Sequence, residues 1–336
     1  MGHSQPKERE VAEELLSCQQ RGVQVDLVCD FNRSSRMGDD DGTLHNSLLS
    51  RRTLVNANPI SGVKKAVVDA AGIKGLVEVL GVYHVKYIIV DDTLILTGAN
   101  LSEEYYTTRE DRYVVLQCGS VHAFFVSVSE LFANENEIQN SQAAKASLEE
   151  KLREWKGEAS PQKRYDAQAT QSNVIGWVEP NFNFPKQAAN ADPATSSCDE
   201  FINDAELLSD IASRHRQKHG SYPWIGIQTA YFNPTNEMLE VFKDITSGGG
   251  SITVITASGK SHGFYQPPTS STNTRTWIPS AYKYIAEKVG EMDGVEVKLW
   301  EKEGWTFHRK GIWVANVVRE ERDIVKANGW YIFCSF

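Results

Sequence analysis

Two histidine–lysine pairs are the residues of this sequence with the clearest chemical potential: His84-x-Lys86 and His308-x-Lys310. Both pairs lie in runs rich in β-branched and aromatic residues, which favour a strand. Residues two apart on a strand project from the same face, so the imidazole and the ammonium of each pair point the same way. An imidazole can attack phosphorus and an ammonium can hold phosphoryl oxygens. The pattern therefore predicts phosphoryl transfer through a histidine.

The first pair has supporting residues within a predicted β-hairpin that covers 82–102, with Asp91-Asp92 as its turn. Asp91 is expected to accept the second N–H of an imidazole, as the carboxylate of a catalytic triad does. Gly98 and Asn100, at the end of the return strand, add a small backbone and an amide donor. An isolated His-x-Lys is usually a surface pair at the mouth of a buried hairpin. These extra residues favour a phosphate-binding site over that interpretation.

The second pair lies in the run 304–318 and repeats the same geometry on a strand-like segment. If two halves meet across a pseudo-twofold interface, one histidine can attack phosphorus while the other protonates the leaving group. That division of labour requires two imidazoles in different protonation states. The second copy is imperfect, because Ala315 stands at the position that matches Asp91.

The elements around the two pairs follow a common order. A predicted helix at 8–20, a glycine and a strand at 23–31 precede the first pair. A helix at 236–246, a glycine-rich turn and a strand at 251–258 precede the second. The distance from Val23 to His84 is 61 positions, and from Ser251 to His308 it is 57. The matched spacing predicts an α/β fold made of duplicated halves, each a mixed β-sheet flanked by helices.

The predicted boundary between the halves is near residue 165, which gives units at 1–165 and 166–336. Residues 133–172 are polar and helix-favouring, and are expected to form a surface helix and a linker. The second half has a strand at 223–234 before its helix, and the first half has no counterpart. We therefore expect the first half to lack its N-terminal strand.

The bulk composition is that of an ordinary globular protein, with 336 residues, 40% apolar residues and a net charge of −9. The net negative charge argues against a dedicated nucleic-acid partner. The five cysteines are widely scattered, which favours a reducing compartment and argues against a structural zinc site. The sequence shows no cluster at metal-ligand spacing. It also shows neither a transmembrane run nor a presequence at its start.

The hairpin run HVKYIIVD followed by GAN resembles the HKD signature of the phospholipase D superfamily. Longer stretches resemble the CDP-diacylglycerol–glycerol-3-phosphate phosphatidyltransferases of mitochondria: DFNRSSR (30–36), HVKYIIVDDTLILTGANLSEEYYTTREDRY (84–113), TAYFNPT (229–235), GFYQPP (263–268), IPSAY (278–282) and GWTFHRKGIW (304–313). The resemblance spans roughly 10–130 and 220–314. In the superfamily a Gly-Ser-x-Asn strand usually follows the second pair. Only 26 residues follow Lys310, and they end in WYIFCSF, so we expect this strand to be incomplete.

The resemblance implies transfer of a phosphatidyl group from CDP-diacylglycerol to glycerol 3-phosphate, with release of CMP and peripheral contact with a membrane. It implies a mitochondrial location and a mechanism without a cofactor, and it leaves dependence on divalent cations open. The implied catalytic residues are His84 as nucleophile and His308 as acid and then base, with Lys86, Asp91 and Lys310. Asn100 and Gly98 are implied at the phosphoryl group.

Two other hypotheses compete with this one. One is another HKD phosphodiesterase that acts on lipid or nucleic acid, and the other is a truncated relative that binds lipid without turnover.

Several other residues give weaker functional signals. Arg33 and Arg36 either grip phosphate or line a solvated loop. For Arg109, Asp111 and Arg112, ion pairing within the fold is favoured over substrate contact. His262 either lines the site or lies at the surface.

Overall fold

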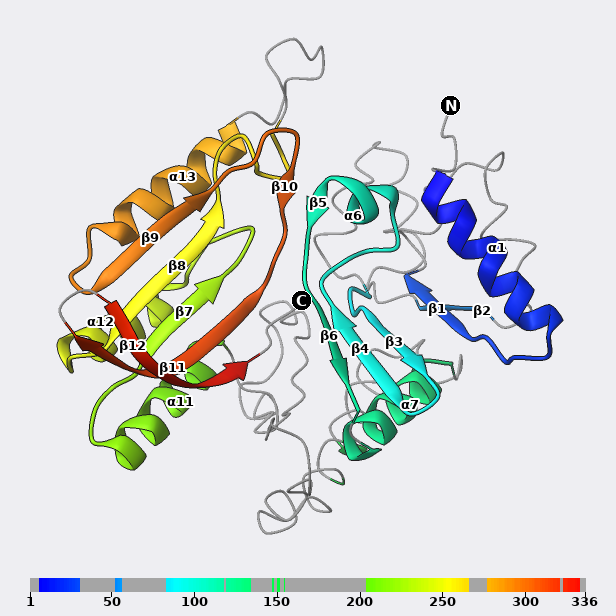
Figure 1. The fold of residues 1–336 in the computed structure, drawn as a ribbon, viewed down its shortest axis with the longest axis horizontal. Helices are drawn as coiled ribbons and strands as arrows, with labels where there is room; N and C mark the ends of the chain where they lie inside the picture. The colour runs from blue at the N-terminus through cyan, green and yellow to red at the C-terminus, as the bar shows by residue number, and fades with distance from the viewer. Residues whose placement is uncertain are drawn as a thin grey trace, which may run out of the picture. The chain divides into compact units, whose positions relative to one another are not determined.

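The computed structural model describes most of the two halves and leaves parts of their loops and the region between them undescribed. The described residues are 6–30, 52–55, 83–117, 119–133, the helical positions 147, 150, 151 and 154, then 204–265, 277–320 and 323–332. The chain divides into two compact units (Figure 1). Unit 1 comprises Met1–Leu96, Leu101–Glu103 and Val115–Phe201, and unit 2 comprises Thr97–Asn100, Glu104–Val114 and Ile202–Phe336. Each unit is described by itself.

The first unit contains helices and two small sheets. In chain order its elements are α1 (Pro6–Gln20), β1 (Leu27–Asp30), β2 (Arg52–Val55), β3 (Tyr87–Val90), β4 (Thr93–Thr97), β6 (Tyr113–Leu116) and α7 (Gly119–Ala133). Strands β1 and β2 pair in parallel, and β3, β4 and β6 form a second sheet in that order. The last residue of β4 and the first two residues of β6 belong to unit 2.

The predicted hairpin is confirmed, although its strands are shorter than the sequence indicated. Strands β3 and β4 pair in antiparallel register from Tyr87↔Leu96 to Val90↔Thr93, and Asp91 takes a positive φ of 51° in the two-residue turn. Aspartate tolerates this backbone region better than most residues. The first strand begins only at Tyr87, so His84 and Lys86 precede the regular strand.

Alternation along the hairpin buries one face of its sheet. Leu94 and Leu96 pack with residues of α7 in a core of Leu94, Leu96, Phe124, Phe125, Val128 and Leu131. The ring of Tyr87 meets Phe125 edge-on at 5.0 Å, and its hydroxyl bonds Ser129 at 2.8 Å. This packing of β-branched and aromatic residues against a helix holds the hairpin that carries the first signature.

The second unit is built on a five-stranded mixed sheet. Its elements are α6 (Glu103–Thr107), whose first residue belongs to unit 1, then β5 (Arg109–Glu110), α11 (Asp204–His219), β7 (Trp224–Gln228), α12 (Asn236–Ser247), β8 (Ser251–Ala257), α13 (Trp277–Gly290), β9 (Val295–Trp300), β10 (Thr306–Phe307), β11 (Gly311–Glu320) and β12 (Asp323–Ile332). The strand order is β12-β11-β7-β8-β9. Strands β7, β8 and β9 are parallel and connected through α12 and α13, whereas β11 runs antiparallel to both of its neighbours.

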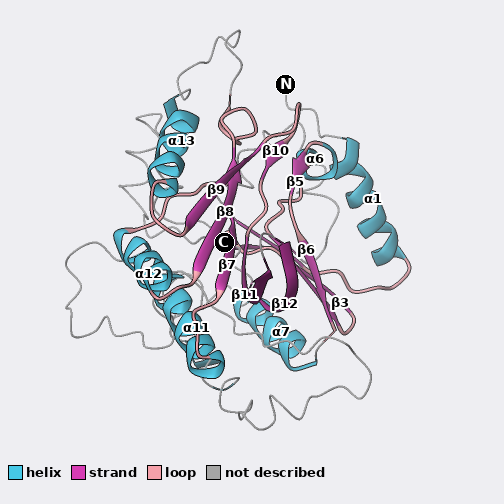
Figure 2. Cartoon of the chain, turned by 60° about the vertical axis from the view of Figure 1, so that its left-hand side comes forward, coloured by secondary structure: helices cyan, strands magenta, loops and turns pink. Residues whose placement is uncertain are grey.

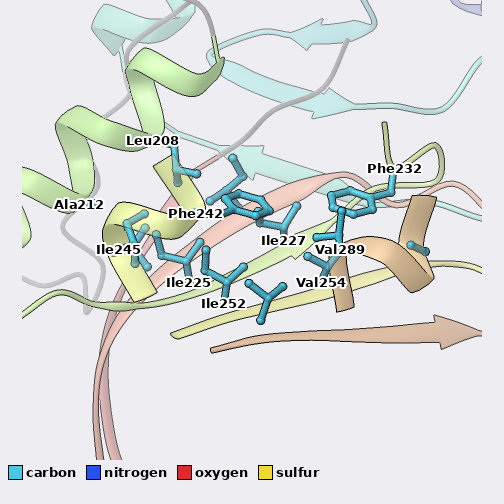
Figure 3. Packing of buried hydrophobic residues seen from close by; sticks show 14 residues of the cluster. Leu208, Ala212, Ile225, Ile227, Phe232, Phe242, Ile245, Ile252, Val254 and Val289 are labelled. Atoms are coloured by element: carbon cyan, nitrogen blue, oxygen red, sulfur yellow. The ribbon is translucent and has the colours of Figure 1, made fainter. Parts of the chain in front are cut away.

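Helices α11, α12 and α13 lie along one side of this sheet in both views (Figures 1 and 2). The core between sheet and helices takes alternate residues of each strand, such as Ile225 and Ile227 of β7 and Ile252 and Val254 of β8 (Figure 3). From α12, Phe242 and Ile245 pack into it and are almost fully buried. Removing one such side chain from water contributes about 1.5–3 kcal/mol.

Helix α12 begins and ends where its sequence predicts. The hydroxyl of Thr235 accepts a hydrogen bond from the N–H of Met238 and caps the N-terminus. Gly248 closes the last turn, because its N–H donates to the carbonyl of Asp244 at 3.1 Å. The following Gly249 has a φ of +88°, a conformation that glycine adopts without strain. The predicted helix 236–246 and strand 251–258 are therefore confirmed as α12 and β8.

The helix–glycine–strand order also holds in the first unit, where α1 is followed by Gly22, at a φ of +86°, and by β1. The duplication of the halves and the boundary near 165 stay predictions. The predicted helix and linker at 133–172 lies largely outside the described residues. The terminal run predicted as a strand is in part the end of β12, and 333–336 are not described. In the described part of the chain, no helix is both long and apolar enough to cross a membrane.

Candidate active site

His308 is held beside the segment 105–112 by a short parallel pairing inside the second unit. Strand β10 pairs with β5, with Thr306 opposite Arg109 and Phe307 opposite Glu110. Immediately after this pairing the N–H of His308 donates to the carbonyl of Glu110 at 2.8 Å. Two segments about 200 positions apart therefore meet at one backbone register, which places His308 next to Asp111.

The imidazole of His308 forms a short hydrogen bond with the carboxylate of Asp111. The distance from Nδ1 to Asp111 Oδ2 is 2.7 Å, and the two side chains are only 8% and 2% exposed. A carboxylate can only accept a hydrogen bond, so the proton of this contact belongs to Nδ1. This is the contact by which a buried carboxylate orients a catalytic histidine.

Lys310 completes the predicted His-x-Lys pair on the same side of the backbone. Its Nζ donates to the carbonyl of His308 at 2.9 Å and lies 2.8 Å from Nδ1 and 3.2 Å from Nε2 of the ring. Burial lowers the pKa of Lys310 to about 8. The cation is thus kept in a partly desolvated place beside the ring, where it can interact strongly with phosphoryl oxygens.

Gly98, which the sequence analysis placed beside His84 and Lys86, lies close to the groups around His308. A Cβ at this position would lie 3.0 Å from both carboxylate oxygens of Asp111 and 3.1 Å from Nζ of Lys310. Any side chain at position 98 would therefore press on the two groups that flank His308. Glycine is required here for close approach and not for an unusual backbone conformation.

The other ring nitrogen of His308 faces Tyr105, a buried residue of α6. The Tyr105 hydroxyl lies 3.5 Å from Nε2, and the two rings meet edge-on with centroids 5.3 Å apart. The same hydroxyl oxygen receives Nδ2 of Asn100 at 3.3 Å and Nη1 of Arg109 at 3.3 Å. Asn100, predicted at the phosphoryl group, is thus linked to His308 through one phenol oxygen.

Arg109 has further partners that fix its guanidinium. Its Nε donates to the hydroxyl of Thr306 at 3.0 Å, and its Nη2 pairs with Glu104 at 2.9 Å. The pairing with Glu104 agrees with the ion-paired role expected for this arginine. Arg112 has a packing role too, because it stacks over the ring of Trp313 at 4.0 Å and bonds Gln228 at 2.6 Å.

An aromatic cluster borders His308 on the side of the loop after β8. Tyr231 lies edge-on to His308 with centroids 5.9 Å apart, and it also contacts His262, Phe264 and Tyr282. His262 is 1% exposed, so the surface location considered for it is wrong. Its Nδ1 accepts the N–H of Phe264 at 3.2 Å, and burial lowers its pKa to about 4.

Burial also sets the charge of the central groups. It lowers the pKa of His308, and the bond to Asp111 opposes that shift without cancelling it. It raises the pKa of Tyr105, so the phenol keeps its proton. At neutral pH the site therefore presents a neutral imidazole, a protonated phenol and an ammonium. Among the described residues, no three side chains of the metal-ligating types gather to hold a metal ion.

The first signature lies in the other unit. His84 and Lys86 are half-buried in the stretch before β3, and Nζ of Lys86 donates to the carbonyl of His84 at 2.7 Å. The preceding Tyr83 donates its N–H to Asp30 at 2.7 Å, which anchors this stretch to the buried last residue of β1. The predicted meeting of both signatures at a pseudo-twofold interface stays a prediction.

Asp91 has a different location from the one the sequence reasoning gave it. It is exposed at the tip of the hairpin, and the length of β3, roughly 13 Å, separates it from His84 and Lys86. The structure therefore does not bring this carboxylate to the first imidazole. Ala315, its match by spacing, is buried in the middle of β11 opposite Trp224. Arg33 and Arg36 lie outside the described residues.

Two residues of this site were not assigned a catalytic role from the sequence: Asp111 and Tyr105. Both lie in the NLSEEYYTTREDRY run after the first signature, and both contact the histidine of the second signature. Spacing within one signature cannot reveal a partner that is 197 positions away. The narrow match of that run to a family was the only available signal.

Comparison with solved structures gives the class of fold. The crystal structure of a phosphatidylserine synthase from Haemophilus influenzae matches 93% of this chain and 69% of that chain, with a TM-score of 0.59 at 16% sequence identity. The expected α/β fold is confirmed by this match. No family model matches the sequence.

Curated relatives are similar over most of the chain. A probable CDP-diacylglycerol–glycerol-3-phosphate 3-phosphatidyltransferase from Dictyostelium discoideum is 24% identical over 92% of this chain and 57% of its own length. The mitochondrial enzymes of that name from Mus musculus and Homo sapiens are 23% and 24% identical, again over 92% of this chain and over 62% and 61% of theirs. The resemblance inferred from the motifs is thus confirmed. The chain spans about three fifths of the length of these relatives.

Proposed function

We propose that this chain transfers a phosphatidyl group from CDP-diacylglycerol to sn-glycerol 3-phosphate, giving phosphatidylglycerophosphate and CMP. The observation that carries the proposal is the contact of His308 with Asp111 and Lys310 inside a phospholipase D-like fold. A neutral, oriented imidazole next to a partly buried ammonium is suited to a phosphodiester centre, and the similar relatives are named for this reaction.

The polar groups around His308 have assignable roles in this proposal. The substrate phosphoryl oxygens carry negative charge, which increases on the equatorial oxygens as the leaving group departs. Lys310 and Arg109 supply the cations, and Asn100 supplies an amide donor. His84 and Lys86, in the other unit, form the second histidine–lysine pair of the sequence. The proposed chemistry uses no cofactor.

The lipid donor and the names of the relatives extend the proposal to location. CDP-diacylglycerol resides in a bilayer, so the chain must contact a membrane surface to reach it. The relatives from mouse and human are named as mitochondrial enzymes, and we propose the same organelle for this protein.

The test is a lipid-product assay with a panel of acceptors. The 336-residue chain is incubated with CDP-diacylglycerol in mixed micelles, with glycerol 3-phosphate, serine, glycerol or no acceptor, and lipids and CMP are quantified. We expect phosphatidylglycerophosphate and CMP in equal amounts only with glycerol 3-phosphate. Phosphatidylserine as the main product would instead match the acceptor named in the structural neighbour. Phosphatidic acid and CMP irrespective of acceptor would identify a phosphodiesterase, and either result contradicts the proposal.

A further inference from the structure

Tyr231 has a hydroxyl group that no hydrogen bond among the described residues uses. Its ring lies edge-on to His308 with centroids 5.9 Å apart, and it packs against His262 at 5.1 Å and Tyr282 at 5.9 Å. Burial raises the pKa of Tyr231, so the phenol keeps its proton at neutral pH. The ring contacts therefore hold, beside His308, a tyrosine whose hydroxyl can donate to a ligand.

The guanidinium of Arg109 also keeps donors for a ligand. A guanidinium has five N–H groups. In the described part of the chain three of them are used: Nε donates to Thr306, Nη1 to Tyr105 and Nη2 to Glu104. One N–H on each terminal nitrogen is therefore left. Glu104 is the competing anion, and its side chain is 59% exposed, so water screens its attraction to the guanidinium.

Gly263 brings the phenol and the guanidinium to one point. A Cβ at this residue would collide with the hydroxyl of Tyr231, and it would lie 3.6 Å from Nη2 of Arg109. The backbone of Gly263 is not in the left-handed region, so glycine is needed here for space and not for its conformational freedom. The missing side chain lets two donors from distant parts of the sequence converge beside this residue.

The turn that contains Gly263 adds a backbone donor. Its two other N–H groups are bonded to His262: that of Tyr265 donates to the carbonyl at 2.8 Å, and that of Phe264 donates to Nδ1 at 3.2 Å. Burial lowers the pKa of His262 to about 4, so Nδ1 stays an acceptor at neutral pH. The N–H of Gly263 has no partner among the described residues.

We propose that Tyr231, Arg109 and Gly263 form a subsite for a phosphate group whose phosphorus is not attacked, beside the reacting group at His308. The inference rests on the proposed function and adds the recognition of a second phosphate to it. Hydrogen bonds to the charged oxygens of a phosphate are stronger than bonds between neutral groups. A guanidinium, a phenol and a backbone N–H at one point are suited to these oxygens, and all three belong to the second unit.

Each proposed substrate carries a phosphate of this kind. Glycerol 3-phosphate has a terminal phosphate monoester, and CDP-diacylglycerol has the phosphate that leaves with CMP. Serine and glycerol have none, so a subsite that holds the acceptor's phosphate discriminates against both of them. A subsite that holds the CMP phosphate orients the leaving group instead. The recognition chemistry is the same in the two cases, and a binding experiment separates them.

Calorimetric titration tests the subsite without requiring turnover. Glycerol 3-phosphate and CMP are titrated separately into the full chain and into Tyr231→Phe, which removes only the hydroxyl. We expect Kd to rise about tenfold for the ligand whose phosphate occupies the subsite, because a hydrogen bond to a charged group is lost. Weaker binding of glycerol 3-phosphate alone identifies the acceptor's phosphate, and weaker binding of CMP alone identifies the nucleotide's. Gly263→Ala should weaken the same ligand, because its methyl group displaces the Tyr231 hydroxyl.

The matched control is Tyr265→Phe, which removes the hydroxyl of an exposed tyrosine in the same turn and should bind both ligands as the natural chain does. Unchanged affinity for both ligands in Tyr231→Phe overturns the subsite. So does an equal loss in the control variant, or a natural chain that binds neither ligand. The lipid-product assay decides the proposed function separately, because it scores the identity of the product and not the affinity. Phosphatidylglycerophosphate formed with unchanged affinities leaves the function standing without the subsite.

Discussion

Around His308, each polar atom has few partners, and this is why its state can be assigned. The side chains of His308 and Asp111 are almost wholly removed from water, so solvent cannot compensate for a poorly matched contact. Asp111 offers only acceptors and Lys310 only donors. The protonation state of the imidazole follows from which of its neighbours can donate and which can accept a hydrogen bond. The contacts of His308 therefore support predictions about its charge and its tautomer.

Replacing Asp111 by asparagine should damage catalysis much more than folding. The amide can turn its NH2 group toward Nδ1 of His308, which favours the tautomer with a protonated Nε2. We expect the maximal rate of CMP release to fall by about 10²- to 10⁴-fold, with little change in the thermal unfolding midpoint. Asp92→Asn, in the exposed hairpin turn, is the matched control and should retain full activity. A drop of less than about threefold in Asp111→Asn would sink this account of the histidine.

The lowered pKa of Lys310 predicts an alkaline limit to activity. The ammonium is the form that holds phosphoryl oxygens, and burial brings its pKa to about 8. Activity should therefore decline as pH rises through about 8. Lys310→Arg keeps a positive charge in this range, because a guanidinium stays protonated. Steady-state rates from pH 6 to 10 should show the alkaline limb in the natural chain and none in the weakly active arginine variant. The same limb in both would contradict the assignment to Lys310.

At the scale of elements, two features position the site. The short β10–β5 pairing fixes the register between His308 and Asp111, and the mixed sheet behind it supplies the rigid base. The sheet is supported by helices whose ends are defined by local chemistry. Helix α12 is the clearest case, because a threonine caps its N-terminus and glycines end it.

Thr235→Ala removes the cap of α12 and should lower the free energy of unfolding by about 1 kcal/mol. The physical reason is the loss of the bond from the Met238 N–H to the threonine hydroxyl, which leaves a helical donor without its protein acceptor. Urea unfolding followed by tryptophan fluorescence measures the change. Thr235→Ser keeps the oxygen and should restore most of the stability. If the alanine and serine variants unfold at the same urea concentration, the cap is not contributing.

The sequence predicts those elements of the fold whose signals are local. Helix α12 has an amphipathic repeat and a glycine-rich end, strand β8 is rich in β-branched residues, and the Asp91 turn marks the hairpin. The His308–Asp111 contact was not accessible, because it depends on the β10–β5 register between segments nearly 200 positions apart. Asp91 was assigned an orienting role from its offset alone. An offset along the chain does not show that β3 carries this residue away from His84.

At the scale of the whole molecule, stability and pH are linked through buried histidines. His262 has a pKa near 4 in the folded chain, against an ordinary value of 6.5, because burial disfavours its charged form. Burial lowers the pKa of His215 as well. The unfolded chain therefore binds more protons than the folded chain between these values. Stability from this source is complete above about pH 6.5 and is lost as pH falls toward 4.

The thermal unfolding midpoint of the second unit should accordingly fall between pH 7 and pH 5. His262→Phe keeps an aromatic ring against Tyr231 and Tyr282 but removes the nitrogen that titrates. We expect this variant to lose less stability on acidification than the natural chain, whatever its stability at pH 7. An unchanged pH dependence in His262→Phe would show that His262 is not a source of the acid sensitivity.

Isotope exchange tests the central claim of histidine-mediated phosphatidyl transfer most directly. Radiolabelled CMP and unlabelled CDP-diacylglycerol are incubated with the chain in the absence of glycerol 3-phosphate, and label in the lipid is measured over time. A covalent phosphohistidine makes the first step reversible without acceptor, so label should enter CDP-diacylglycerol, and His308→Gln should abolish the exchange. Exchange that requires glycerol 3-phosphate, or formation of phosphatidylglycerophosphate without any exchange, would contradict the account.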